Sequence, residues 1–507
     1  MGAKKVFLNG KFYTLDKTGS QVEALAVDGE RIIALGSNDE VRSAAGPGAK
    51  EIDLEGKTAV PGFIDTHCHL MTHGISQTQM ADLSDSQSIS EIQDRLRRHM
   101  QKNPNLRWVN GERFDQELFS EGRWITRQDL DEVSKDLPVF VVRLCRHALV
   151  ANTAALLPVR DKLTDEQWET GKLTEDDTDL IWSQVPPYTE ADLERALLYG
   201  LDDAKATGLT TVHCQLNNMQ HLGVLRKLRS EGRLPVRVRL QWPVERMDEI
   251  VNEGLKTGSG DDHLRIGSMK IFMDGSLGAR TAAMCEEYSD DPGNIGDLFR
   301  DAEELAEMLI SIQRNDCQAA IHAIGDRAIS HTLRAIEIAM PENNENNRLR
   351  HRIEHIAQLS PQIIADVVRL NVIASIQPQF VITDFWSEKR VGPERYKYMY
   401  PFKTMLDAGT KIGIGSDCPV ERLDTIETIH RAVNREPNSL GERLTVDETL
   451  RGYTYGSAYA GFEENDKGSL EIGKLADFVV LSDDPYCVKP ETLEQIKVLN
   501  TIVGGEM

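Results

Sequence analysis

Two histidines, His67 and His69, lie two positions apart in GFIDTHCHL, a segment with the apolar character of a β-strand. Alternate residues of a strand point to the same face, so both imidazoles would project together while Cys68 points the other way. Neutral imidazoles are common ligands of Zn²⁺. By itself the pair predicts either a metal-chelating edge or two hydrogen-bonded core histidines.

Four further polar residues occur in later strand-like runs: Lys270 in GSMKIFMDGS, His322 in AAIHAIGD, His355 in RIEHIAQ and Asp417 in IGIGSDCP. Each has a structural alternative when taken singly, namely a surface lysine, a satisfied core histidine or a helix N-cap. Together, imidazoles and a carboxylate at successive strand ends predict a site for Zn²⁺ or a similar cation. An ammonium cannot ligate a cation, so Lys270 fits only as a carbamate formed with CO₂, an anionic bridge between two metals.

The elements that must position these residues are alternating strands and helices. Eight strand-like runs, most followed by an amphipathic helical pattern such as DAEELAEMLISIQRN, predict an α/β fold, a parallel (β/α)₈ TIM barrel over residues 61–460. The interval between His69 and TTVHC is much longer than one crossover helix needs. We therefore expect an inserted subdomain at 75–190, after the first strand and near the active site.

The two ends of the chain share a different texture. Residues 1–60 alternate short β-like runs with NG, DG and EG turn dipeptides, and similar runs return in KGSLEIGKLADFVVLSDDP and IKVLNTIVGGEM. Segments too short to bury their own faces are expected to share one sheet. The pattern predicts a composite β-sandwich domain built from residues 1–60 and 461–507.

Composition excludes some partners. The 507 residues include 58 Lys and Arg against 81 Asp and Glu, a formal charge of −23, whereas nucleic acids and anionic membranes favour basic surfaces. The sequence contains no run of about 20 apolar residues, so it predicts no membrane-spanning helix. Seven cysteines without a CxxC pair indicate a reduced, cytoplasmic protein. We expect a small-molecule substrate and a homodimer.

The motifs also carry a family resemblance. VPGFIDTHCHL, IHAIGDRA, HRIEH, GIGSD and GKLADFVVL resemble the amidohydrolase superfamily of metal-dependent hydrolases. KIFMDGSLGARTA, IHAIGDRAI and HRIEHIAQ resemble more narrowly its family 3 branch, the group similar to N-substituted formamide deformylase. The resemblance covers essentially the whole chain and implies an enzyme that hydrolyses a non-peptide carbon–nitrogen bond of an amide, N-substituted formamide or cyclic amide.

The resemblance assigns roles to the six residues at the strand ends. It implies that His67, His69 and Asp417 bind the more buried metal ion. Carboxylated Lys270 would bridge to a second ion held by His322 and His355. Asp417 would act as general base toward a metal-activated hydroxide and then protonate the leaving amine. One or both metal positions would hold Zn.

One departure concerns the bridging ligand. Some relatives use a cysteine of the second strand in place of the lysine, and here TTVHC ends in Cys214. Either His213 or Cys214 faces the barrel interior, not both, and the sequence leaves the register open. A free buried thiol is the structural alternative for Cys214.

Four residues are candidates for substrate binding. His147 and Asn152, in LCRHALVANTAAL, resemble an inserted segment that reaches toward the active site, with a surface histidine and an N-cap as the alternatives. Arg280 would hold a substrate carboxylate or pair with nearby acidic runs, and Gln377 would line the pocket.

Two other functions fit the same residues. A metal-dependent esterase, lactonase or phosphoester hydrolase would use the same activated water, because the loops choose the substrate. A catalytically silent scaffold would keep the barrel without the reaction.

Overall fold

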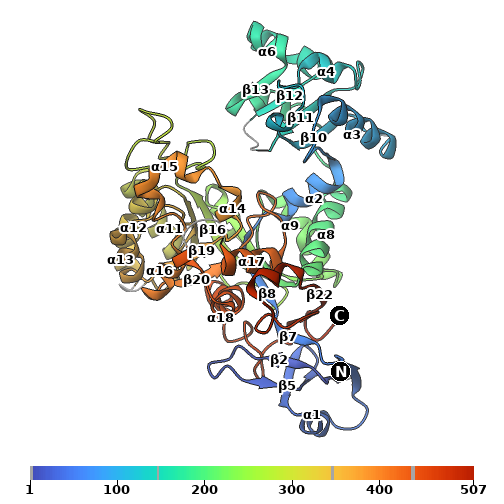
Figure 1. Ribbon diagram of the computed structural model, residues 1–507, viewed down its shortest axis with the longest axis vertical. Coiled ribbons are helices and arrows are strands. Elements are labelled where there is room, and N and C mark those ends of the chain that lie inside the picture. The colour runs from blue at the N-terminus through green and yellow to red at the C-terminus, as the bar shows by residue number, and fades with distance from the viewer. Residues whose placement is uncertain (1–3, 105, 145–147, 344–346, 436–439) are drawn as a thin grey trace. The chain divides into compact units, whose positions relative to one another are not determined.

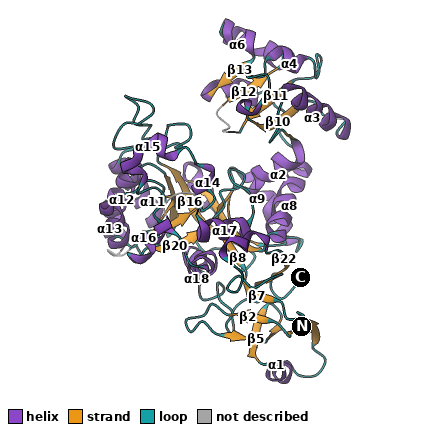
Figure 2. Ribbon diagram, viewed as in Figure 1, coloured by secondary structure: helices purple, strands orange, loops and turns teal. Residues whose placement is uncertain are grey.

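The computed structural model describes residues 4–104, 106–144, 148–343, 347–435 and 440–507. The chain forms two compact units, one of Met1–Leu70 with Leu201–Met507 and one of Met71–Gly200. Figure 2 shows that both units combine helices and strands. Among the described helices, none has the length and apolar character needed to cross a bilayer.

The larger unit contains an eight-stranded sheet in which every neighbouring pair is parallel. Its strands, in spatial order, are β8 (Phe63–Cys68), β14 (Leu209–Gln215), β15 (Arg237–Pro243), β16 (Leu264–Phe272), β17 (Gln318–Ala323), β18 (Arg352–His355), β19 (Ile373–Ile376) and β20 (Lys411–Ile414). Beyond β20 the chain returns to β8, where the Asp417 amide donates to the His67 carbonyl and the His69 amide to the Cys418 carbonyl, both at 2.7 Å. These bonds join the end of β8 to the segment that follows β20 and nearly close the sheet, and the predicted parallel barrel is confirmed.

Helices connect the barrel strands, and three more in the described residues follow β20, the last of these strands (Figure 1). They are α8 (Glu190–Ala206) before β14, then α9 (Met219–Ser230), α10 (Met247–Val251), α11 (Ala302–Arg314), α12 (Asp326–Ala339), α13 (Pro361–Arg369), α14 (Phe380–Thr383), α15 (Ser387–Tyr396), α16 (Phe402–Asp407), α17 (Thr425–Asn434), α18 (Val446–Arg451) and α19 (Ser457–Ala460). In α11, Asp301 and Glu304 form a capping box, and Leu305, Leu309 and Ile312 are buried on one face. A capped, one-sided apolar helix of this kind packs on a barrel wall and leaves the strand ends free for polar residues.

Two small sheets complete the larger unit. One contains β1 (Lys5–Leu8), β4 (Ala24–Asp28), β5 (Arg31–Gly36) and β6 (Lys50–Asp53), with α1 (Asn38–Ala45) beside it; the other contains β2 (Lys11–Tyr13), β3 (Gln21–Val22), β7 (Thr58–Pro61), β21 (Phe478–Leu481) and β22 (Val498–Ile502). Strand β7 pairs with β21, so the two ends of the chain share one sheet (Figure 1). Between the sheets, Phe7 and Phe12 pack edge-on against Phe478.

The unit Met71–Gly200 has its own sheet, ordered β13 (Lys172–Thr174), β12 (Ala148–Ala151), β11 (Val139–Arg143), β10 (Val109–Phe114) and β9 (Ala81–Asp82). Its helices are α2 (Leu70–Gln79), α3 (Ile89–Lys102), α4 (Arg127–Asp131), α5 (Thr153–Leu156), α6 (Asp165–Thr170) and α7 (Asp179–Trp182). Val139 and Val141 belong to one apolar cluster and Phe140 and Val142 to another, so both faces of β11 are buried. The segment therefore has a core of its own.

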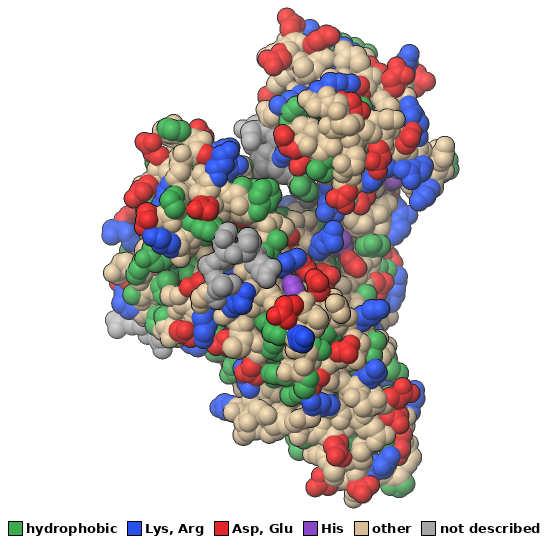
Figure 3. All heavy atoms as spheres, in the orientation of Figure 1, with side chains coloured by type: hydrophobic (Ala, Val, Ile, Leu, Met, Phe, Trp, Pro, Cys, Tyr) green, Lys and Arg blue, Asp and Glu red, His purple; other side chains and the backbone are tan. Residues whose placement is uncertain are grey.

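Charged side chains of both signs are interspersed over the face drawn in Figure 3. No large single-sign field of the kind that steers polyanions is visible on that face.

Candidate metal centre

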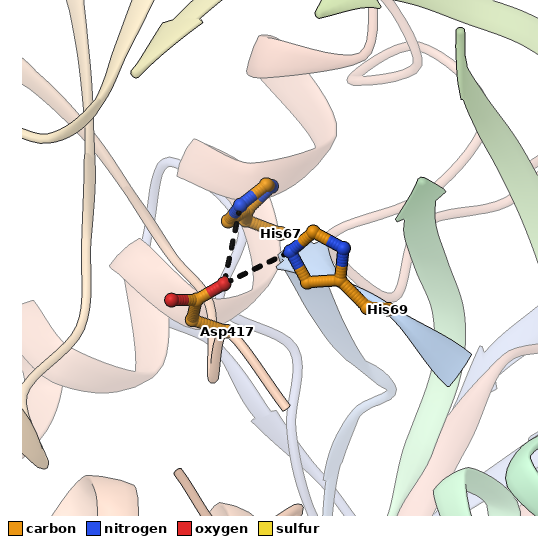
Figure 4. A group of neighbouring side chains, drawn as sticks. All are labelled: His67, His69 and Asp417. Carbon is orange, nitrogen blue, oxygen red and sulfur yellow. Dashed lines mark hydrogen bonds and ion pairs between the residues drawn. The ribbon is translucent and has the colours of Figure 1, made fainter. Parts of the chain in front are cut away.

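His67, His69 and Asp417 converge at the end of β8 (Figure 4). The Asp417 Oδ1 atom lies 3.3 Å from His67 Nε2 and 3.1 Å from His69 Nε2, and the three ligand atoms lie within 4.8 Å of one another. Two ligands of a tetrahedral ion with bonds of 2.0–2.1 Å are separated by about 3.3 Å. The spacing and chemistry of this donor set therefore fit a divalent cation such as Zn²⁺.

The backbone of the turn after β20 directs the Asp417 carboxylate toward His67 and His69. Asp417 has a φ of 58°, a left-handed conformation uncommon outside glycine and typical of strained functional sites. Asp65 lies beneath it, fully buried, and its Oδ1 accepts hydrogen bonds from the amides of His67 and Ser416. Asp65 thus ties the two ligand-bearing segments together. Sequence reasoning missed it, although a carboxylate two residues before His67 in the same motif was an available signal.

The other three predicted ligands lie in the same barrel interior. Lys270 Nζ is 3.0 Å from His67 Nε2. The rings of His322 and His355 are 4.5 Å apart between centroids, and those of His67 and His355 are 5.4 Å apart. His355 has a φ of 73°, the second left-handed residue among these groups. The structure therefore brings all six strand-end residues together from β8, β16, β17, β18 and the turn after β20.

Hydrogen bonds determine which imidazole nitrogen remains available. His355 Nδ1 lies 3.0 Å from Gln377 Oε1, an acceptor, so Nδ1 carries the proton and Nε2 keeps its lone pair. His322 Nε2 lies 3.0 Å from the Gly275 carbonyl oxygen, which leaves Nδ1 free. Gln377 was expected to contact substrate. It is 1% exposed and contacts His355, a predicted metal ligand, and its contact with substrate stays a prediction.

The protonation states favour cation binding. Burial lowers the pKa of Lys270 to about 8 and that of His322 to about 3. Burial alone would raise the pKa of the Asp417 carboxyl, but the neighbouring His67 and His69 side chains outweigh it and hold the pKa well below its usual value. At neutral pH the centre accordingly offers neutral imidazoles at His69, His322 and His355, a carboxylate and an amine that is easily deprotonated.

Asn152 has a structural role in the inserted unit. Its Oδ1 accepts from the amides of Val139 and Ala155, and its Nδ2 donates to the carbonyls of Ser134 and Leu137. It is the N-cap of α5, and its amide group has no unused hydrogen-bonding position. The capping alternative therefore describes Asn152 in this structure.

The other two substrate candidates are also accounted for. His147 lies outside the described residues. Arg280 donates from Nε and Nη2 to the two carboxylate oxygens of Asp290, at 3.1 and 2.9 Å. The pairing alternative thus describes Arg280, because one of the nearby acidic residues occupies its guanidinium.

The register of β14 separates the two bridging candidates. His213 Nδ1 accepts from Arg352 Nη1 at 2.8 Å inside the barrel. Cys214 interacts with Cys68, whose thiol lies 3.6 Å from the His213 carbonyl oxygen on the other side of the strands. Cys214 therefore faces away from the ligand cluster, and Lys270 is the candidate that reaches it.

A closed parallel barrel with imidazoles, a carboxylate and a lysine at its strand ends defines a metal-dependent hydrolase. The chain belongs to the amidohydrolase family, which it matches over residues 50–507.

Known proteins support the assignment. The chain is 33% identical to the putative amidohydrolase YtcJ of Bacillus subtilis, over 99% of both chains. It is 29% identical to the N-substituted formamide deformylase of Arthrobacter pascens, over 99% of this chain and 97% of that protein. A solved structure of an uncharacterized metal-dependent hydrolase from Pyrococcus furiosus has 32% identity and a TM-score of 0.83, covering 95% of this chain and 100% of the other. The predicted family is confirmed.

Proposed function

We propose that this protein hydrolyses the carbon–nitrogen bond of a small amide, N-substituted formamide or cyclic amide. The observation that carries the proposal is the Asp417 carboxylate, which lies within 3.3 Å of two imidazole nitrogens that are themselves suited to a cation. The likeness to a formamide deformylase over nearly the whole chain supports this choice of bond.

Two divalent ions, proposed to be zinc, would be held by the six strand-end residues. His67, His69 and Asp417 would form one position, and His322 and His355 the other. A bound ion of this kind lowers the pKa of its water from 15.7 to about 7 and polarises a carbonyl group.

Lys270 would join the two positions as a carbamate. The Nζ ammonium first loses one proton; the neutral amine then attacks the carbon of CO₂, a nitrogen–carbon bond forms as one carbon–oxygen π bond opens onto oxygen, and a second proton leaves nitrogen to give the anionic carbamate. Burial supports this step because it lowers the pKa of the amine to about 8, so the nucleophilic form is accessible near neutral pH. The proximity of Nζ to His67 Nε2 directs the new carboxylate toward the metal position.

Asp417 would move the proton. Its carboxylate accepts a proton from the attacking water and then delivers it to the nitrogen that leaves as an amine. The low pKa of Asp417 keeps it ionised at the start of the reaction. A leaving nitrogen needs this proton more than an ester oxygen does, which favours a residue placed to shuttle it.

A matched substrate panel tests the reaction. Amides, N-substituted formamides and cyclic amides are compared with esters and lactones of the same acyl groups, using zinc-loaded protein and kcat/KM as the measure. We expect turnover of at least one C–N substrate above its matched ester. A preference for esters or lactones throughout would replace the proposal with an esterase or lactonase, and inactivity on every member would indicate a silent scaffold.

Metal analysis provides a separate test. Protein produced in zinc-replete medium should carry between one and two equivalents of zinc, and electron density at Lys270 should extend three atoms beyond Nζ. Well under one equivalent would overturn the metal-dependent mechanism. The cytoplasmic location and the homodimer remain predictions, which fractionation and sedimentation would check.

A further inference from the structure

Gln241 is a buried polar residue that no catalytic role explains. It lies on β15, is 1% exposed, and its Oε1 is 2.8 Å from His67 Nδ1. We propose that Gln241 is a positioning residue that fixes the tautomer and ring orientation of His67 for metal binding. The inference rests on the proposed metal-dependent function and adds a residue from a strand that supplies none of the six proposed ligands.

The surroundings of Gln241 determine which way its amide points. Its Nε2 lies 3.2 Å from the Thr66 carbonyl oxygen and 3.4 Å from Glu354 Oε1, both acceptors. The Nε2 group is the donor that this side requires, so the carbonyl Oε1 must face the imidazole. His67 Nδ1 consequently donates, and Nε2 keeps the lone pair that faces Asp417 and Lys270.

A buried ion pair between Arg352 and Glu354 fixes the two acceptors that face Gln241. Arg352 Nε donates to Glu354 Oε1 at 2.8 Å, and Arg352 Nη2 donates to the same Thr66 carbonyl at 2.9 Å. Arg352, Glu354 and Gln241 are each at most 1% exposed, so water does not compete for these bonds. The two acceptors that orient Gln241 are thus themselves fixed.

The role differs from a purely structural hydrogen bond. If the His67 ring could rotate, or carry its proton on Nε2, the Nε2 lone pair would not face the cation. The histidine would then act as a ligand for only part of the time. Partners that fix ligating histidines are worth about 10–100-fold in metal affinity or activity. Gln377 bears the same relation to His355, through Oε1 and Nδ1 at 3.0 Å.

The test measures zinc affinity by competition with a chromophoric chelator. Gln241→Met keeps the length of the side chain but removes the acceptor, and it should weaken the tightest zinc site by about 10–100-fold. The paired variant Gln241→Glu/Glu354→Gln keeps an acceptor opposite Nδ1 and places an amide, instead of a second carboxylate, beside residue 241. It should bind zinc within about threefold of the wild type, as carboxylate–histidine–zinc triads do. The loss should appear in kcat at limiting zinc and disappear at saturating zinc, with KM unchanged.

Gln313→Met is the matched control. Gln313 is also buried and also pairs with a buried histidine, since its Nε2 is 2.9 Å from His351 Nε2. It lies on α11 and contacts none of the proposed ligands. Its variant should lose folding stability, measured by urea unfolding of the metal-free protein, and keep the wild-type zinc affinity.

Three outcomes would overturn the inference. They are a zinc affinity of Gln241→Met within twofold of wild type, an equal loss in Gln313→Met, or a tenfold or greater loss in Gln241→Glu/Glu354→Gln. If Gln241→Met does not fold, the paired variant decides alone. A wild-type protein that takes up well under one equivalent of zinc would instead contradict the proposed function, so the two failures are distinguishable.

Discussion

Strand β15 contributes residues to two buried polar regions, which differ in how their polar groups are compensated for the loss of water. Near its carboxyl end, Gln241 contacts His67 of the candidate metal centre. Near its amino end, Arg237 and Arg239 enter a network of ion pairs. Both regions place polar side chains almost wholly out of water, which is costly unless partners replace it.

The ion-pair region supplies its partners from within the chain. Arg237 donates to Asp477 at 2.7 and 3.0 Å and to Glu30 at 2.8 Å, and Arg239 pairs with Glu463. Lys467 Nζ lies 3.2 Å from the other Glu463 oxygen. Glu30 and Asp477 come from the terminal segments, so these charges attach the terminal sheets to the barrel.

The metal centre has no comparable internal balance. The ligand atoms of His67, His69 and Asp417 lie within 4.8 Å of one another, and the neighbouring amine of Lys270 has its pKa lowered by burial. The contrast distinguishes two kinds of buried polar cluster. Where ligand atoms converge without an opposite charge, the cluster indicates a functional site. Where each charge already has a partner of opposite sign, the cluster joins parts of the structure.

Asp417→Asn should have the largest effect and should separate the two regions most clearly. The amide cannot take or deliver a proton, so kcat/KM should fall by about 10³-fold or more at saturating zinc. The urea midpoint of the metal-free protein should change little. Near wild-type turnover in this variant would remove Asp417 from the chemistry.

Asp477→Asn should show the reverse pattern. Removing one partner of a buried ion pair leaves Arg237 with only Glu30, and the free energy of unfolding should fall by about 3 kcal/mol. Urea unfolding measures this loss. The kcat of the folded enzyme should match the wild type, and a large fall in kcat would mean that the joint and the metal centre are not independent.

The pH dependence of stability should also separate the regions. The folded-state pKa of His322 is about 3 and that of His351 about 4, both lowered by burial, whereas an unfolded histidine titrates near 6.5. Below pH 6.5 the unfolded chain therefore binds more protons than the folded one, and metal-free protein should lose about 2 kcal/mol per such histidine by pH 5.

The carboxylates of the ion-pair network should not contribute in that interval. Asp477 and Glu463 have pKa values lowered by their cationic neighbours despite the opposing effect of burial, so both are ionised at pH 5. Their contribution is present above the unfolded pKa of about 4 and is lost only at lower pH. Urea midpoints at pH 7, 6 and 5 should have the same slope in Asp477→Asn as in the wild type. A flattened slope would contradict the assignment to imidazoles.

Cys214→Ala should have the smallest effect. The thiol faces Cys68 rather than the ligand cluster, and a buried free cysteine behaves as a small apolar side chain, so kcat/KM should stay within about twofold of wild type. Lys270→Ala should instead lose activity as Asp417→Asn does. Equal losses in Cys214→Ala and Lys270→Ala, measured at saturating zinc, would reopen the choice of bridging ligand.

The sequence predicted the barrel and the convergence of six strand-end residues because both follow from local patterns. Strand and helix periodicity sets the βα units, and parallel strands bring their carboxyl ends to one rim. The register of β14 could not be predicted from the sequence, because whether His213 or Cys214 faces the barrel interior depends on pairing with neighbouring strands.

The substrate candidates belong to residue types with other common roles. Asn152 and Arg280 are residue types that also serve as caps and ion-pair partners, and the structure gives them those roles. Gln241 was not foreseen because its importance arises from a contact 174 positions away in the chain, which no local motif reveals. Asp65 was overlooked for a different reason, as its motif was read only for ligands.

The joint between the first and last barrel strands has a consequence for synthesis of the protein. His69 and Asp417 are separated by 348 residues, so a ribosome adding 5–20 residues per second needs about 20–70 s between them. His67 and His69 therefore leave the ribosome long before the carboxylate exists. If these three residues bind a metal ion as proposed, its capture is a late event, and a nascent chain that stalls before residue 417 carries only an incomplete chelator.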